Sequence, residues 1–72
     1  MLYPEVLDYK GIQYILYAVV VHKGHCNGGH YYSFVKCGRL WFKCDDEVVS
    51  LDKEEEHINP DAYILFYTKF DF

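Results

Sequence analysis

The stretch YILYAVVVH, from Tyr14 to His22, is the segment that decides the fold of this 72-residue chain. Its residues are almost continuously apolar, and most of them are β-branched or aromatic. Such a run predicts a strand that is buried on both faces. The run from Val19 to Val21 disfavours a helix, because β-branched side chains lose rotamer freedom against the preceding helical turn. We therefore expect a central β-strand here.

Three more segments predict strands around this one. His30–Lys36 reads HYYSFVK, and Leu40–Cys44 follows it after a tight turn that we expect at Cys37-Gly38, so the two predict a hairpin. AYILFY, from Ala62 to Tyr67, is an apolar run like the first. Alternation along a strand would place His30, Tyr32 and Phe34 on one face and Tyr31, Ser33 and Val35 on the other.

The remaining segments predict connections rather than strands. Met1–Gln13 contains Pro4 and Gly11 and has no sustained period, so we expect an irregular or edge segment. Lys23–Gly29 holds three glycines in seven residues and predicts a loop, and Ser50–Pro60 predicts a polar connection with one helical turn at most. The predicted fold class is mostly β, an antiparallel sheet of about four strands.

The composition is rich in apolar residues for so short a chain. Of the 72 residues, 51% are hydrophobic and 19% are aromatic. A chain of this size buries only roughly 60% of its unfolded surface, and no further segment is available to cover a second sheet face. We therefore expect part of the apolar surface to pack against something outside this chain.

Charge and cysteine usage exclude several classes of function. The net charge of −4 argues against nucleic-acid binding, which needs a basic stripe. No run of 18 apolar residues predicts a membrane span, and the N-terminus lacks the pattern of a secretory signal. An odd count of three cysteines without such a signal predicts free thiols and an intracellular location, cytoplasmic or nuclear.

The predicted hairpin brings an aspartate opposite a histidine. If Cys37-Gly38 is a two-residue turn, Lys36 pairs with Arg39, and counting back along both strands sets His30 against Asp45. A three-residue loop shifts the register by one and sets His30 against Asp46. Directly opposed Cβ atoms lie about 4.5–5.5 Å apart, which is close enough for an imidazole–carboxylate hydrogen bond.

A histidine held by a carboxylate suits a general base. The carboxylate fixes the tautomer and stabilises the imidazolium that forms when the ring accepts a proton. Gly28 and Gly29, directly before His30, would allow a substrate backbone to approach without meeting a Cβ atom. The alternative is a structural ion pair, which is the more frequent role of such a cross-strand pair.

The hairpin supplies no evident nucleophile. Cys44 and Asp45 are consecutive strand residues, so they point to opposite faces, and Cys37 lies at the far end of the hairpin, roughly 20 Å from His30. Cys26 lies in the glycine loop, where nothing lowers the pKa of its thiol. We interpret all three cysteines as passive thiols.

A zinc site is the other chemistry that these residues allow. His22, His25 and Cys26 cluster near His30, but the paired C-x2-C knuckles of structural zinc sites are absent. We predict no metal and no cofactor.

Four motifs in order resemble the C-terminal, histidine-bearing part of the ubiquitin-specific protease catalytic domain. They are YILYAVVVHKG, GGHYYSFVK, LWFKCDDEVV and AYILFY, and the opening YPEVLD resembles the proline-containing segment before them. The resemblance covers essentially the whole chain. It implies that residues 1–72 are the β half of a papain-like α+β cysteine peptidase domain.

The resemblance also implies roles for individual residues. His30 would be the general base of a Cys-His-Asp triad, Asp45 its orienting carboxylate and Asp46 an assisting neighbour. Gly28, Gly29 and Tyr31 would line the channel for the C-terminal tail of ubiquitin. The implied reaction is thiol attack on the carbonyl of ubiquitin's terminal glycine, which cleaves an isopeptide, peptide or thioester bond, and the implied partner is ubiquitin or a ubiquitinated protein.

The N-terminal segment that carries the nucleophile in this family, the Cys box, has no counterpart in these 72 residues. The connection between YPEVLD and YILYAVVVH is also short for the family. We therefore expect the isolated chain to be inactive and to need a Cys-box lobe or a partner chain. Two alternatives stay open, a non-catalytic ubiquitin-binding or scaffolding module and a degenerate fragment.

Overall fold

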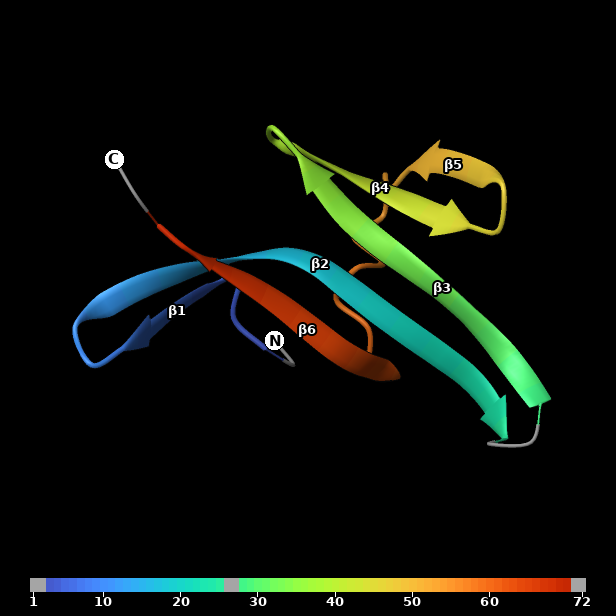
Figure 1. Cartoon of the computed structure of the whole chain (residues 1–72). Coiled ribbons are helices and arrows are strands. Elements are labelled where there is room, and N and C mark those ends of the chain that lie inside the picture. Colours follow the sequence, from blue (N-terminus) through green and yellow to red (C-terminus); the bar gives the residue numbers. More distant parts are fainter. Residues whose placement is uncertain (1–2, 26–27, 71–72) are drawn as a thin grey trace.

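The computed structural model describes residues 3–25 and 28–70, and within them every regular element is a β-strand (Figure 1). The six strands form one antiparallel sheet, which confirms the mostly β, antiparallel fold class and corrects the expected number of about four. The strands are β1 (Val6–Tyr9), β2 (Ile12–His25), β3 (Gly28–Cys37), β4 (Leu40–Asp45), β5 (Val48–Leu51) and β6 (Ala62–Lys69).

Strand β2 is central, as the sequence predicts. Tyr14 and Ile15 pair with both β1 and β6, and Ala18 to Val21 pair with both β3 and β6. One edge of β2 is thus shared in succession by β1 and β3, while β6 occupies the other edge. Strands β4 and β5 extend the sheet beyond β3.

Three predicted boundaries are wrong. Gln13 belongs to β2, and β1 forms a hairpin with it through Lys10 and Gly11, whose φ angles of 53° and 80° suit a type I′ turn. Lys23–Gly29 is not one loop, because β2 continues to His25 and pairs it with Gly28. Ser50 and Leu51 lie on β5, and the connection from 52 to 61 contains no helical turn.

The core lies on one face of the sheet, where β2, β3 and β6 meet. Val19 pairs with Phe34 of β3 and with Leu65 of β6. Leu16, Val19, Val21 and Phe34 are fully buried, and Trp41 of β4 is 8% exposed. Leu16 and Val19 share this face although they are three residues apart, because the register with β6 shifts between Leu16 and Ala18 and an extra strand residue reverses the alternation.

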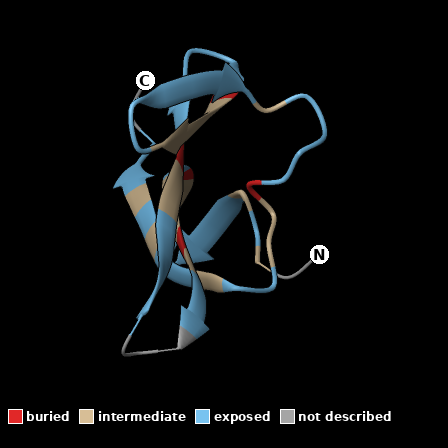
Figure 2. Ribbon diagram, turned by 90° about the vertical axis from the view of Figure 1, so that its right-hand side faces the viewer, coloured by how far each residue is buried: buried red, intermediate tan, exposed pale blue. Residues whose placement is uncertain are grey.

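The connection between β5 and β6 covers this core face. It runs behind β3 and β2 in the view of Figure 1 and carries His57, which is 2% exposed, onto Trp41. Figure 2 shows the few buried residues on the inner side of the strands and on this connection. The N-terminal segment joins it, since the Tyr3 hydroxyl donates to the carbonyl of His57.

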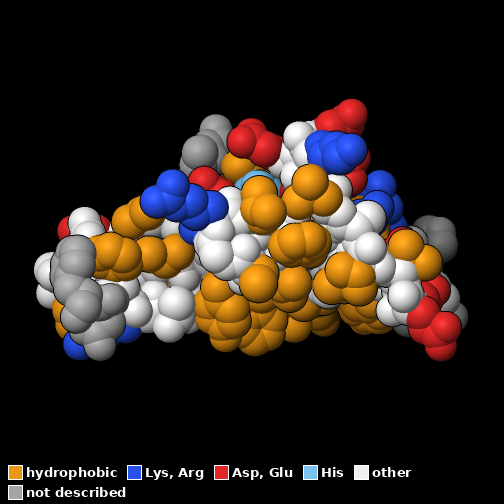
Figure 3. All heavy atoms as spheres, turned by 90° about the horizontal axis from the view of Figure 1, so that it is seen from above, with side chains coloured by type: hydrophobic (Ala, Val, Ile, Leu, Met, Phe, Trp, Pro, Cys, Tyr) orange, Lys and Arg blue, Asp and Glu red, His pale blue; other side chains and the backbone are white. Residues whose placement is uncertain are grey.

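The opposite face is apolar and open. Tyr17, Val35, Ile64 and Phe66 are each between 37% and 43% exposed, and the register of β2 with β3 and β6 places the last three around Ala18 and Val20. Figure 3 shows hydrophobic side chains gathered along one side of the sheet. Within the described residues, no helix has the length and apolar character needed to cross a membrane.

Candidate functional site

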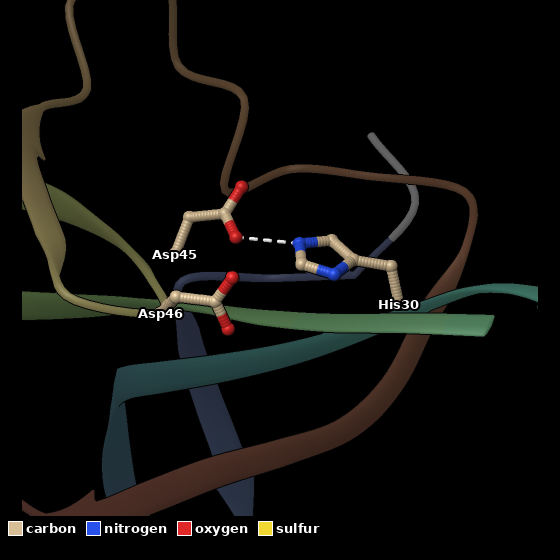
Figure 4. A group of neighbouring side chains, drawn as sticks. All are labelled: His30, Asp45 and Asp46. Atoms are coloured by element: carbon tan, nitrogen blue, oxygen red, sulfur yellow. Dashed lines mark hydrogen bonds and ion pairs between the residues drawn. The ribbon is translucent and has the colours of Figure 1, made fainter.

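The predicted histidine and its two predicted carboxylates lie together at one end of the β3–β4 hairpin (Figure 4). His30 is the third residue of β3, Asp45 is the last residue of β4, and Asp46 begins the turn to β5. The Nε2–H of His30 donates to Oδ1 of Asp45 at 2.5 Å. One nitrogen of His30 and one oxygen from each aspartate all lie within 4.8 Å of one another.

The hairpin reaches this contact through a register that differs from the predicted one. Cys37 pairs with Leu40, so the two-residue turn is Gly38-Arg39 and not Cys37-Gly38, and Lys36 pairs with Trp41. Gly38 has a φ of 66°, which is the positive value that the first central position of such a turn demands. The sequence count therefore placed the turn one residue too early.

His30 and Asp45 still meet, because the observed register of β3 and β4 differs from the predicted one by two residues. The ladder ends at Ser33 and Cys44, and its continuation would set Asp45 opposite Tyr32. His30 and Tyr32 share a face, since a shift of two leaves the face unchanged. Asp45 thus reaches His30 as a diagonal neighbour, a separation that longer side chains can span.

The surroundings of His30 hold the ring and leave it open to solvent. The ring stacks on Tyr32, with centroids 5.9 Å apart and an interplanar angle of 29°. Tyr32 is itself held from two sides, by the Lys43 ammonium 4.7 Å from its ring centroid and by the Asn59 amide, which donates to its hydroxyl at 3.5 Å. The His30 side chain is 49% exposed. With Nε2–H directed at Asp45, Nδ1 of a neutral ring carries the lone pair that can accept a proton.

The two glycines before His30 differ in what surrounds them. A Cβ atom on Gly29 would lie 2.6 Å from both the Lys23 carbonyl oxygen and Nε2 of His22, so the close approach of β2 and β3 itself requires glycine there. A Cβ atom on Gly28 would meet nothing within 4 Å. Only Gly28 therefore borders open space, while the small size of Gly29 serves the strand pairing.

Tyr31 lies on the other face of β3 from His30. Its ring packs on His22 with centroids 4.3 Å apart and meets Tyr63 of β6 edge-on at 6.2 Å. The side chain is 57% exposed. Gly28 and Tyr31 thus lie near His30 in sequence, at the same end of the sheet, and the Tyr31 ring packs against His22 and Tyr63.

Neither of the two cysteines in the described residues can bring its thiol to His30. Cys44 pairs with Ser33, and it points away from the face of its neighbour Asp45 because consecutive strand residues alternate. Cys37 is exposed at the turn end of β3, seven residues from His30, a separation of more than about 20 Å at the usual strand rise. Cys26, the third predicted passive thiol, lies outside the described residues.

A second histidine cluster was not predicted. The Nδ1–H of His57 donates to Asp52 at 2.7 Å, its Nε2–H donates to Glu5 at 2.9 Å, and its ring stacks on Trp41 at 4.1 Å with a 5° interplanar angle. Both ring nitrogens therefore face carboxylate oxygens, which lie on two different segments of the chain. The sequence signal was modest, a lone histidine that follows an aspartate by five residues in a turn-rich connection.

Asp52 is the anchor of this second cluster. Burial acts to raise the pKa of its carboxyl group, but hydrogen bonds from the His57 side chain and from the backbone N–H groups of Glu56 and His57 outweigh burial and hold the pKa below its ordinary value. Burial also raises the pKa of the Tyr3 and Tyr67 hydroxyls nearby, which stay neutral. The cluster is buried behind the sheet, so it has the character of a structural brace rather than of a reacting site.

Residues 4–67 match the family model described as ubiquitin carboxyl-terminal hydrolase. The chain belongs to this family. Among similar proteins, ubiquitin carboxyl-terminal hydrolase 17-like protein D of Mus musculus is 42% identical over 93% of the chain, and ubiquitin carboxyl-terminal hydrolase 42 of Homo sapiens is 37% identical over 93%. The match confirms the resemblance to ubiquitin-specific proteases.

Solved structures agree with the family. The Ubp8-Sgf11-Sgf73-Sus1 SAGA DUB module contains a chain that matches 99% of this one at 40% identity, with a TM-score of 0.87. A second structure of the module, with Ubp8(C146A) and bound to monoubiquitin, matches 99% at 39% identity, with a TM-score of 0.86. The chain spans 18% of the length of each of these chains, and 14% and 6% of the mouse and human relatives.

Proposed function

We propose that this chain is the base-bearing part of a cysteine-type deubiquitinase, the C-terminal portion of a ubiquitin-specific protease catalytic domain over residues 1–72. The observation that carries the proposal is the hydrogen bond from His30 Nε2 to Asp45 at 2.5 Å, at the open end of the sheet. Membership of the hydrolase family supports it, as do the ubiquitin-bound states of similar structures.

In the proposed reaction, Nδ1 of His30 takes the proton of a thiol supplied by a Cys-box lobe that lies outside these 72 residues. The thiolate attacks the carbonyl carbon of ubiquitin's terminal glycine, and the imidazolium then gives the proton to the leaving amine. Water hydrolyses the resulting thioester, with His30 again acting as base. Asp45 holds the ring through Nε2–H and stabilises its charged form, and Asp46 adds a second negative charge nearby.

The proposed path of the ubiquitin tail passes Gly28, Gly29 and Tyr31. Gly28 borders open space, which suits the close approach of a Gly-Gly terminus. Tyr31 offers an exposed aromatic ring one residue after the base. The two aspartates give this end of the sheet a negative potential, which favours a basic peptide.

A chimera tests this function. This chain would replace the matching segment of the Ubp8 deubiquitinase, to which it is 40% identical, and hydrolysis of a ubiquitin C-terminal amide would be measured. We expect activity that falls at least about 100-fold in His30→Gln and substantially in Asp45→Asn. Glu47→Gln, which removes a neighbouring charge, should change little.

Two results would decide against the proposal. Activity that survives His30→Gln would remove His30 from its role as base. A folded chimera without hydrolysis would favour the non-catalytic alternative, and titrating ubiquitin into the 72-residue chain would then show whether the chain acts as a ubiquitin-binding module.

A further inference from the structure

The charges around His30 are unbalanced. The side chain faces two carboxylates, with Nε2 2.5 Å from an oxygen of Asp45 and with the carboxylate of Asp46 in the same group. Figure 4 shows both carboxylates on the Nε2 side of the ring. An imidazolium supplies at most one positive charge against two negative ones, whereas a divalent cation supplies two. Bound cations are often the largest local charge in such sites.

The spacing of the three ligand atoms suits a metal ion. Zinc lies about 2.0–2.2 Å from imidazole nitrogen and carboxylate oxygen atoms, which sets tetrahedral ligand atoms roughly 3.4 Å apart. The three ligand atoms lie within 4.8 Å of one another, and the hydrogen-bonded pair of His30 Nε2 and Asp45 Oδ1, which is 2.5 Å apart, would have to open by about 0.9 Å for both atoms to bind one ion. The side chains of His30 and Asp45 are 49% and 35% exposed, so small side-chain rotations meet little resistance.

The backbone at Asp46 fixes the third ligand. Asp46 has a φ of 53° at the first position of the turn between β4 and β5. This left-handed conformation is unusual for a residue with a side chain, although aspartate and asparagine tolerate it best. The hairpin from β4 to β5 thereby holds the Asp46 carboxylate beside that of its neighbour Asp45, where strand alternation alone would have turned it away.

We propose that His30, Asp45 and Asp46 form a binding site for a divalent transition-metal ion, with Zn²⁺ as its test ligand. One imidazole and two carboxylates suit zinc and similar ions, and they leave positions open for water. Mg²⁺ and Ca²⁺ prefer oxygen ligands alone and bind such a mixed set less well. The site differs from the cluster of His22, His25 and Cys26, which lacks the paired knuckles of a structural zinc site.

Metal binding and base catalysis exclude each other at this site. A metal on Nε2 leaves a neutral imidazole with its single proton on Nδ1, so Nδ1 has no lone pair with which to accept a thiol proton. Zinc would therefore hold the enzyme in an inhibited form. This consequence rests on the proposed function, whereas the binding site itself does not.

Titrating Zn²⁺ into the full 72-residue chain under reducing conditions tests the site, with the side-chain NMR resonances of the histidines as the readout. We expect a saturable shift of the His30 resonances with one ion per chain. Asp46→Asn should weaken binding at least about tenfold, and asparagine keeps the turn because it accepts a positive φ. Glu47→Gln, which removes the same charge one residue away, should leave the affinity unchanged. Mg²⁺ should not compete.

Other outcomes would overturn the site. If Asp46→Asn and Glu47→Gln weakened Zn²⁺ binding equally, the loss would reflect general electrostatic attraction and not coordination by Asp46. Unchanged affinity in His30→Gln, or zinc-induced shifts centred on Cys37 and Cys44, would place the ion elsewhere.

If the metal-free chimera lacks hydrolysis while His30 still binds zinc, the proposed function fails and the metal site stands. Circular dichroism of each variant would verify that it folds.

Discussion

His57 joins three segments that lie far apart along the chain. Its two nitrogens donate to Asp52 and to Glu5, which is 52 residues away, and its ring stacks on Trp41. With the histidine 3% and Asp52 2% exposed at the side chain, the contact between them is shielded from solvent. Removing one partner of a buried polar pair leaves the other without compensation, which makes this cluster a sensitive point of the fold.

Asp52→Asn is predicted to lower the free energy of unfolding by about 1–3 kcal/mol near pH 7. The pKa of Asp52 is lowered in the folded state, so its stabilising contribution is complete above the ordinary aspartate pKa of about 3.9 and is lost as the pH falls through the lower folded value. Urea denaturation between pH 7 and pH 2 measures this. The variant should lose less stability on acidification than the wild-type chain.

The matched control for this prediction is Asp8→Asn on the exposed strand β1. It removes the same charge and should alter stability by less than about 0.5 kcal/mol. If the two variants had the same pH profile, the stabilising role of the Asp52–His57 pair would be disproved.

Individual residues were predictable where their partners are close in sequence. The proximity of His30 and Asp45 follows from a single hairpin, and it tolerated a register error of two residues because both registers keep the same face. The contact between His57 and Glu5 depends on how the β5–β6 connection folds back over the sheet. No local pattern encodes that path, so the sequence did not reveal this cluster.

At the scale of the elements, the long apolar strands were predictable and the short ones were not. β2 and β6 each contain a nearly continuous run of apolar residues, which is long enough to predict a strand from the sequence alone. β1 and β5 have four residues each, and all four are exposed in both strands. Edge strands of this kind lack the alternation that signals burial, and they are fixed by pairing with a neighbouring strand. Their detection therefore needs the tertiary structure.

The junction of β2 and β3 gives a prediction about the two glycines. Gly29→Ala should destabilise the chain by about 1–3 kcal/mol, since its Cβ atom would lie 2.6 Å from the Lys23 carbonyl oxygen and the strands would have to separate. Gly28→Ala should leave stability unchanged within about 0.5 kcal/mol, because its Cβ atom would meet nothing within 4 Å. Urea denaturation of both variants measures the difference, and equal losses would refute the packing requirement at Gly29.

The two sheet faces divide the whole molecule into a covered side and an open side. The β5–β6 connection and the N-terminal segment cover the face that carries Val19 and Phe34. The open side is the apolar surface that the composition predicted, and the chain spans only 6% to 18% of the relatives described above. The sequence indicates that the chain has more apolar residues than its own segments can bury. Only the strand register shows on which face of the sheet the remaining ones lie.

Adjacent residues of β6 test this division. Leu65 packs against the core and Ile64 is 42% exposed on the open face. Leu65→Thr should cost about 2 kcal/mol or more of stability, because it places a hydroxyl and a void in the packed layer. Ile64→Thr should cost less than about 1 kcal/mol and should reduce the binding of an apolar fluorescent dye, because it removes exposed apolar area. Urea denaturation and dye titration on both variants measure the two effects. A larger stability loss in Ile64→Thr would mean that the faces are assigned the wrong way round.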